Sequence, residues 1–195
     1  MATVLQEKLD PKRWLSLIAV SLGVFMALID TTVVNVALPS IQTSLNASYS
    51  DLQWVISAYT IVFSVLLLIW AKLGDLYGRK LMFIVGLVIF TIGSGLDAVS
   101  TSISMLHIFR AVQAIGGSAL MSLSFALIGT TFNGKERGMA LGILSSIIGL
   151  STASGPLVGG WLVDTFSWQS IFTINLPIGI ITIIMASLFI SNHQA

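Results

Sequence analysis

The sequence contains no cysteine and few charged residues. Without cysteine, the 195-residue chain can form neither a disulfide nor a Cys-ligated metal or redox site. Charged residues make up 9% of the chain, against about 25% in an average soluble domain. The formal net charge of +1 gives no electrostatic case for nucleic-acid binding. The two histidines, His107 and His193, are too far apart to indicate a metal site.

Hydrophobic residues make up 55% of the chain and are gathered into long runs. A bilayer core about 30 Å thick needs about 20 apolar helical residues at about 1.5 Å each. The runs are continuous and do not alternate with polar residues, so we expect helices. The sequence predicts six membrane spans: Trp14–Leu38, Leu52–Ala71, Leu81–Val99, Met105–Thr130, Met139–Val163 and Ile171–Ser191.

The basic residues alternate between the connections. They are concentrated in the N-terminal segment and in the connections after the second and fourth runs: Lys8, Lys12, Arg13, Lys72, Arg79, Lys80, Lys135 and Arg137. Cytoplasmic loops of membrane proteins carry an excess of Lys and Arg. We therefore predict an integral membrane protein with a cytoplasmic segment 1–13, a six-helix bundle 14–191 and a cytoplasmic end 192–195.

Two opposite charges lie inside predicted spans. Asp30 is about two-thirds along the first run and Arg110 is early in the fourth, so both fall in the outer half of the bilayer. A lone charge at the bilayer centre costs about 2.5–3.5 kcal/mol, and such residues usually have a function. We expect Asp30 and Arg110 to form a pair or share a polar cavity, with proton or substrate binding as the role. The alternative is an ion pair that only fixes helix packing.

Three further polar residues are candidates for the substrate cavity. Gln113 lies three residues after Arg110, on the same helical face. Asn35 follows Asp30 on the first run. Asp97, near the outer end of the third run, is expected to be solvated at the interface, with recognition of a cation as its alternative role.

The fifth run is rich in glycine and contains a proline. Small residues four apart allow close helix contact, and proline removes a backbone donor and bends a helix. This combination predicts a hinge, with ordinary close packing as the alternative. Its residues are Gly142, Gly155, Pro156, Gly159 and Gly160.

A charged segment, AKLGDLYGRK at residues 71–80, separates the second run from the third. We expect a tight hairpin on the cytoplasmic face. The candidate functional residues of this segment are Gly74, Asp75, Gly78, Arg79 and Lys80.

Five local patterns together resemble one family. They are IDTTVVNVALP at 29–39, AKLGDLYGRK at 71–80, RAVQAIGGSAL at 110–120, GPLVGG at 155–160 and WQSIFTINLPIG at 168–179. Their order and spacing resemble the N-terminal half of a major facilitator superfamily transporter, and within it the fourteen-helix drug:proton antiporters. The sequence departs from the family patterns at Ala71, Leu76, Ala114, Ser151 and Gln169.

The resemblance implies two three-helix repeats, no enzymatic activity and no cofactor beyond a proton gradient. It implies proton coupling through Arg110, for which we take Asp30 as the partner. It implies a conformational switch at the 71–80 segment and export of amphipathic or cationic substrates, although an uptake symporter for a small metabolite remains an alternative. The expected location is a bacterial plasma membrane.

Transporters of this kind use two helix bundles around a midplane site. We therefore expect a partner bundle of six or eight helices, either in a longer chain of which this is a fragment or in another protomer. The remaining alternative is a membrane half that does not transport. On the first two interpretations, this chain alone is not expected to transport.

Overall fold

The protein is described here by a computed structural model that places residues 10–191. The predicted end 192–195, and residues 1–9 of the predicted N-terminal segment, lie outside the described residues. Within the described range the chain forms seven helices and no strand. They are α1 (Arg13–Leu45), α2 (Tyr49–Tyr77), α3 (Arg79–Ala98), α4 (Ile103–Thr131), α5 (Gly134–Thr165), α6 (Ser170–Thr173) and α7 (Asn175–Phe189).

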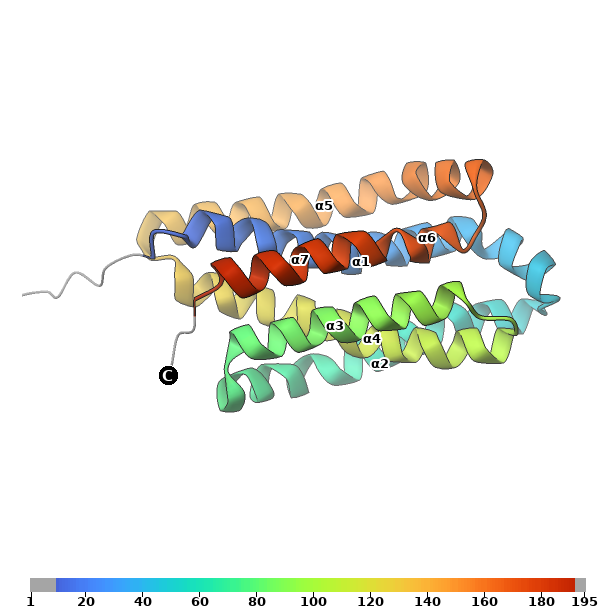
Figure 1. Cartoon of the computed structure of the whole chain (residues 1–195), viewed down its shortest axis with the longest axis horizontal. Helices are drawn as coiled ribbons and strands as arrows, with labels where there is room; N and C mark the ends of the chain where they lie inside the picture. The colour runs from blue at the N-terminus through green and yellow to red at the C-terminus, as the bar shows by residue number, and fades with distance from the viewer. Residues whose placement is uncertain (1–9, 192–195) are drawn as a thin grey trace, which may run out of the picture.

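The helices lie side by side along one long axis (Figure 1). Short α6 and α7 follow one another and make a single apolar span, Ser170–Phe189, so residues 10–191 contain six segments able to cross a membrane. The predicted all-α membrane bundle is confirmed. The helices extend past the apolar runs, as α1 does by continuing from Leu38 to Leu45, because helical hydrogen bonding persists where polar side chains meet water.

The 71–80 segment forms the expected tight turn, but its residues are helical up to Tyr77 and again from Arg79, beyond the predicted span ends at Ala71 and Leu81. α2 continues to Tyr77 and α3 begins at Arg79, so Gly78 alone lies between them. Gly78 has φ of 100°, a conformation that favours glycine because a Cβ would be strained there. Its amide donates to the carbonyl of Gly74 at 3.0 Å and closes α2. The charged segment is therefore a helix end and a one-residue turn.

The sixth span is divided into α6 and α7, although Ile174 between them keeps helical backbone angles (φ −62°, ψ −26°) and its amide donates to the carbonyl of Ser170 at 3.1 Å. Pro177 lies three residues after Ile174 and has no amide hydrogen for the carbonyl of Thr173, and its ring crowds that carbonyl. The helical hydrogen bond lost at Pro177 thus lies where α6 meets α7, and Asn175 is the first residue of α7.

The packing exchanges helices between the two halves of the chain. α1 packs against α5 and α7, while α4 packs against α2 and α3. α1 also contacts α4, and α3 contacts α7. Swapping α1, α2 and α3 with α4, α5 and α7 leaves this pattern unchanged, and corresponding helices run in opposite directions. This is the pattern of an inverted repeat, as the two three-helix repeats require.

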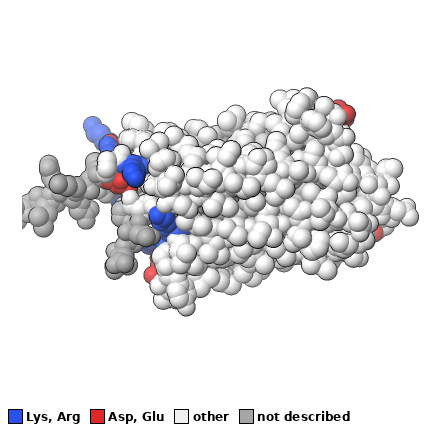
Figure 2. Space-filling model, viewed as in Figure 1, with Lys and Arg blue, Asp and Glu red and all other residues white. Residues whose placement is uncertain are grey.

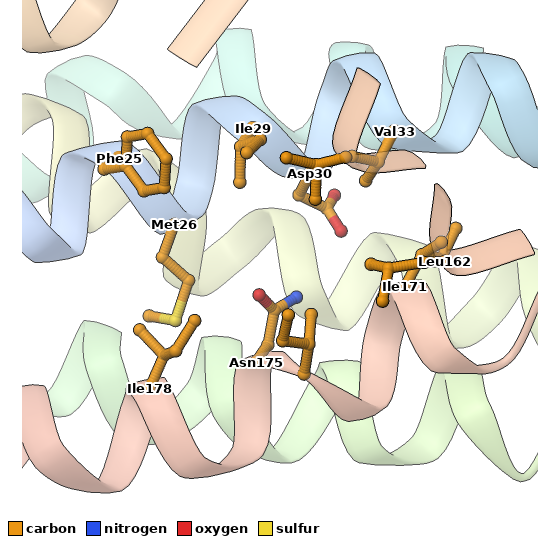
Figure 3. Close-up of a pocket in the computed structure, with 11 residues that line it drawn as sticks. Phe25, Met26, Ile29, Asp30, Val33, Leu162, Ile171, Asn175 and Ile178 are labelled. Atoms are coloured by element: carbon orange, nitrogen blue, oxygen red, sulfur yellow. The ribbon is translucent and has the colours of Figure 1, made fainter. Parts of the chain in front are cut away.

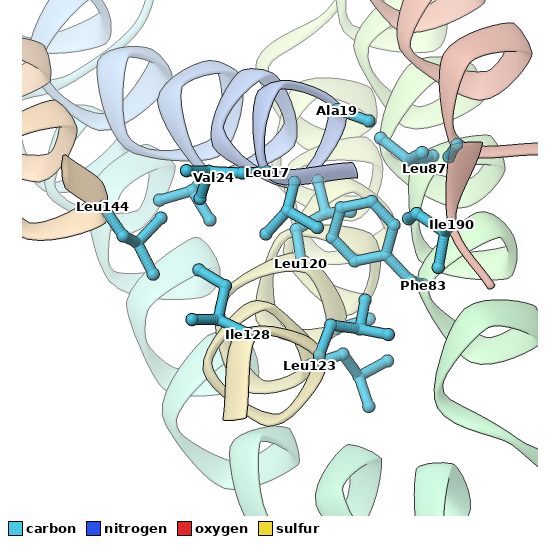
Figure 4. Close-up of a cluster of buried hydrophobic side chains, with 14 of the residues drawn as sticks. Leu17, Ala19, Val24, Phe83, Leu87, Leu120, Leu123, Ile128, Leu144 and Ile190 are labelled. Carbon is cyan, nitrogen blue, oxygen red and sulfur yellow. The ribbon is translucent and has the colours of Figure 1, made fainter. Parts of the chain in front are cut away.

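Two apolar clusters fill the bundle on either side of one polar level. The first includes Val24, Phe83, Leu87 and Leu120 (Figure 4). The second lies beyond Asp30 along α1 and includes residues of α2, α4 and α6. α3 and α4 approach so closely that a side chain at Gly116 would meet the backbone of Phe90, which explains the glycine there.

Apart from buried Arg110, the basic side chains of residues 10–191 gather at one end of the bundle. α1 begins and α7 ends at that end, and the Lys and Arg visible on this face lie there (Figures 1 and 2). Arg13 and Glu136 join the starts of α1 and α5 there, with Nε to Oε2 at 2.7 Å and Nη2 to Oε1 at 2.9 Å. Lys80 Nζ donates to the carbonyl of Ser187 at 3.1 Å. That this end is cytoplasmic remains a prediction.

Candidate functional site

The centre of the bundle holds a closed polar cluster made by Asp30, Arg110 and Gln113. Arg110 Nη1 donates to Asp30 Oδ2 and to Gln113 Oε1, the latter at 2.7 Å. Gln113 Nε2 donates to Asp30 Oδ1 at 3.0 Å. Each residue is at most 1% exposed. The structure therefore brings together three of the predicted site residues, and both carboxylate oxygens of Asp30 are bound.

Aromatic rings and a backbone carbonyl complete the surroundings of the guanidinium. Arg110 Cζ lies 4.2 Å from the ring centroid of Tyr59 and 5.9 Å from that of Phe172. Its Nε donates to the carbonyl of Val55 at 3.4 Å. A cation over a desolvated aromatic face is stabilised by the ring quadrupole. The Arg110 charge is thus contacted by protein groups from several directions.

A cavity of about 230 Å³ lies beside this cluster, between α1, α5, α6 and α7. Asp30 and Asn175 point into it from opposite sides (Figure 3). The other lining residues are apolar: Phe25, Met26, Ile29, Val33, Val158, Leu162, Ile171, Ile174 and Ile178. Apolar lining with few polar groups is typical of sites for small molecules. Asp30 is therefore shared between the ion pair and the cavity wall.

Asn175 is held by a short hydrogen-bonded chain that the sequence analysis did not identify. Its Nδ2 donates to Ser94 Oγ at 2.9 Å, and Ser94 Oγ donates to the carbonyl of Phe172 at 2.8 Å. Tyr59 was missed as well. A signal existed in the sequence, since an asparagine and a tyrosine within apolar runs both mark polar groups at membrane depth.

Asp97 is fully buried, which corrects the expectation of a solvated interfacial residue. It lies in the last turn of α3, and α6 packs against α3 at this end, as the hydrogen bond from Ser94 to Phe172 shows. The sequence position alone suggested the membrane surface. The burial follows from the packing of α4 and α6 against α3, which residue position along the span does not show.

Asn35 does not join the cluster. Five residues at about 100° each place it roughly 140° around the helix from Asp30. It is exposed on the described chain, and its Nδ2 donates to the carbonyl of Thr31 at 3.2 Å. Its assignment to a substrate cavity stays a prediction, but that cavity is not the one beside Asp30.

The 71–80 segment carries a second Asp–Arg pair. Arg79 Nη2 lies 2.9 Å from Asp75 Oδ1, and the two side chains are 32% and 59% exposed. Gly74 is buried, and a side chain there would meet Leu123 of α4. These residues are far along the bundle from the Asp30 cluster, so any switching role is separate from it.

The glycines of α5 differ in their surroundings. Side chains at Gly155 and Gly159 would meet Thr32 and Val33 of α1, so these glycines allow the two helices to approach closely. A Cβ at Gly142 or Gly160 would meet no other atom within 4 Å. Pro156 lies inside α5, which is assigned as one helix from Gly134 to Thr165. Close packing is observed, and the hinge stays a prediction.

A model of the Major Facilitator Superfamily matches residues 20–195, which is most of the chain. The chain belongs to the Major Facilitator Superfamily. The family assignment from the five sequence patterns is thereby confirmed, as is the expectation that the chain is not an enzyme.

Curated relatives of the chain are transporters of different substrates. The riboflavin transporter RibZ of Clostridioides difficile is 38% identical over 92% of this chain. The tetracenomycin C resistance and export protein of Streptomyces glaucescens is 35% identical over 93% of it. The multidrug transporter MdtP of Bacillus subtilis is 35% identical over 97%. The chain spans 39%, 34% and 35% of the lengths of these relatives.

The fold also matches a solved structure. A bacterial homologue of the human lysosomal transporter Spinster, in an inward-facing and unoccupied conformation, superimposes with a TM-score of 0.73. The match covers 93% of this chain and 43% of that one, at 22% sequence identity. At that identity the likeness shows the fold alone.

Proposed function

We propose that this chain is one six-helix bundle of a proton-coupled transporter that exports amphipathic or cationic molecules by alternating access. The observation that carries the proposal is the buried Asp30–Arg110–Gln113 cluster in the wall of an apolar cavity. A buried ion pair is weak support for a purely stabilising role, because apolar side chains of similar volume often serve stability as well or better.

The cluster can act as a proton-sensitive switch. Arg110 stays protonated under all relevant conditions, so Asp30 is the member of the pair that can gain a proton. A proton on Asp30 removes the charge that holds the guanidinium. A cationic substrate in the cavity competes with Arg110 for the same carboxylate, since Asp30 faces both. Proton and substrate would then bind alternately, which is the requirement for antiport.

The other half of the mechanism requires a second bundle of six or eight helices, in a longer chain or in another protomer. Rocking of two bundles around a midplane site exposes that site to each face in turn. The exposed Asp75–Arg79 pair at the turn between α2 and α3 is free to contact such a partner. The proposed location is a bacterial plasma membrane with the basic end of the bundle in the cytoplasm.

A second candidate is uptake of a small metabolite. One relative is named as a riboflavin transporter, so the same fold and similar sequences occur with a vitamin substrate. The apolar cavity with one carboxylate favours a cation over riboflavin, and we place export first for that reason.

The test is transport in proteoliposomes under an imposed proton gradient, with a fluorescent lipophilic cation as the probe. Dye movement should follow the gradient when this chain is joined to a second bundle, and should be lost in Arg110→Ala. Asp164→Asn, at an exposed residue on α5, is the matched control. Dye movement that ignores the gradient, or that survives Arg110→Ala, would contradict the proposal. Robust transport by the chain alone would refute the need for a second bundle.

A further inference from the structure

Asp97 is a buried carboxylate that the proposed switch does not use. Its side chain has no exposed surface, and neither oxygen has a hydrogen-bond partner among residues 10–191. Removal of an ionised carboxylate from water without a partner is very costly, and such a group normally becomes neutral. Asp30, by contrast, has partners for both oxygens.

The packing of α3 on α4 places Asp97 at the level of Arg110. A side chain at Gly93 of α3 would touch the backbone of Gln113 of α4, which sets the register of these two antiparallel helices. Asp97 is one turn beyond Gly93, and Arg110 is about one turn before Gln113, so the two lie opposite each other.

Few charged or titratable groups face Asp97. Arg110 of α4, Asp30 of α1 and Tyr59 of α2 are those that lie within electrostatic range. α6 and α7, which also pack against α3, contain no charged or titratable residue. The hydrogen bonds of Arg110 are made by Nε and Nη1, which leaves the N–H groups of Nη2 for a second acceptor.

We propose that Asp97 is a second proton-carrying residue that exchanges roles with Asp30. In the conformation described here, Arg110 is paired with Asp30, and Asp97 carries a proton. When the coupling proton is on Asp30, the guanidinium moves to Asp97, which is then ionised. The inference rests on the proposed function in one respect, that Asp30 is the group to which the coupling proton binds.

The exchange conserves charge within the bundle. The proton of Asp97 passes to Asp30, so one O–H bond breaks at Asp97 and one forms at Asp30, while Arg110 keeps its protons throughout. Each state contains one guanidinium, one carboxylate and one carboxylic acid, so its net charge is zero. With both aspartates ionised the cluster would carry one net negative charge in an apolar interior, which is unfavourable. A second carboxylate therefore lets Arg110 leave Asp30 without becoming an unpaired buried cation.

Infrared spectroscopy of the purified chain in lipid nanodiscs tests this directly at neutral pH. A protonated carboxylic acid has a C=O stretching band that shifts in heavy water and on isotopic labelling of aspartate. The wild-type chain should show such a band, and Asp97→Asn should remove it. Asp97→Asn should keep its thermal unfolding temperature, because an amide closely matches a neutral acid in shape. Asp164→Asn, at an exposed site, should leave the band unchanged.

The variant Asp30→Asn tests whether Asp97 gives up its proton when Arg110 needs a new partner, or keeps that proton permanently. With no carboxylate at position 30, Arg110 should pair with Asp97, and the band should again be lost although Asp97 is present. A band that survives Asp97→Asn overturns the assignment of the proton. A band that survives Asp30→Asn overturns the exchange. Dye transport that ignores the proton gradient, with the band behaving as predicted, would reject the proposed function and leave this inference standing.

Discussion

Two Asp–Arg pairs in this protein have the same chemistry and very different surroundings. Asp30 and Arg110 come from α1 and α4, lie 80 residues apart and are buried with Gln113. Asp75 and Arg79 are four residues apart at the turn between α2 and α3, with side chains 59% and 32% exposed. The first pair is enclosed by protein, and the second is open to solvent and salt.

The difference teaches that burial, and not residue type, decides what such a pair can do. An exposed pair gains little because water already solvates both charges. In a buried pair, the loss of one partner leaves the other charge without solvent or counter-charge. A proton arriving at Asp30 therefore changes the energy of the bundle, whereas a proton arriving at Asp75 changes a surface contact. The predictions below test this contrast, from the largest expected effect to the smallest.

Arg110→Ala should be the most destabilising change. It leaves Asp30 buried and without its counter-charge, for which the expected cost is about 3–5 kcal/mol. The measurement is equilibrium unfolding in mixed micelles followed by helical circular dichroism. The free energy of unfolding should fall less in the double variant Asp30→Asn with Arg110→Ala than the sum of its falls in the two single variants. A decrease in the free energy of unfolding below about 1 kcal/mol for Arg110→Ala would show that the pair contributes no more than an exposed ion pair.

Asp30→Asn should cost less than Arg110→Ala, at about 1–3 kcal/mol. The asparagine still accepts and donates hydrogen bonds, and the freed guanidinium can turn to Asp97. The same unfolding measurement applies. Addition of Asp97→Asn to Asp30→Asn should then lower the free energy of unfolding by a further large amount, because no carboxylate remains for Arg110. Equal stability of the single and double variants would contradict the role of Asp97 as an alternative partner.

Arg13 and Glu136 form an intermediate case. Their side chains are 21% and 31% exposed, and two hydrogen bonds join them across α1 and α5. Arg13→Lys, which cannot donate in the same forked geometry, should lower the thermal unfolding temperature by less than Arg110→Ala. Added salt should reduce the difference in unfolding temperature between the wild type and Arg13→Lys, since partly exposed charges are screened. An effect that is independent of salt would show that Arg13 acts through packing.

Arg79→Ala should have the smallest effect, about 0.3–0.5 kcal/mol, as for other exposed pairs four residues apart. Asp75→Asn is its matched control and should behave alike. Both are measured by unfolding of the chain alone. A loss of 2 kcal/mol or more, far above the roughly 0.2–1 kcal/mol of exposed pairs, would remove the contrast between the two regions.

The membrane spans could be predicted from the sequence because hydrophobic length is a direct consequence of bilayer thickness. The location of the basic residues at one end could also be predicted, because Lys and Arg occur in alternate connections between the spans. The tight turn was predicted but the helix ends were not, because residues such as Lys72 and Asp75 tolerate a helix as readily as a loop, and only Gly78 requires a special conformation.

The candidate site could be predicted only in part. Matching depth placed Asp30 near Arg110, since depth along a span is set by counting residues. Burial of Asp97 and the contact between Ser94 and Asn175 depend on how α6 and the start of α7 pack against α3. Such lateral placement is set by the packing of helices distant in sequence, and no local pattern encodes it.

A double-mutant cycle on each Asp–Arg pair is the most direct test of the account. The coupling energy between Asp30 and Arg110, from unfolding of the single and double variants, should exceed about 1.4 kcal/mol, equivalent to a factor of ten. The coupling energy between Asp75 and Arg79 should stay below about 0.5 kcal/mol. Similar coupling energies for the two pairs would contradict the claim that burial makes Asp30–Arg110 the proton-responsive element of the bundle.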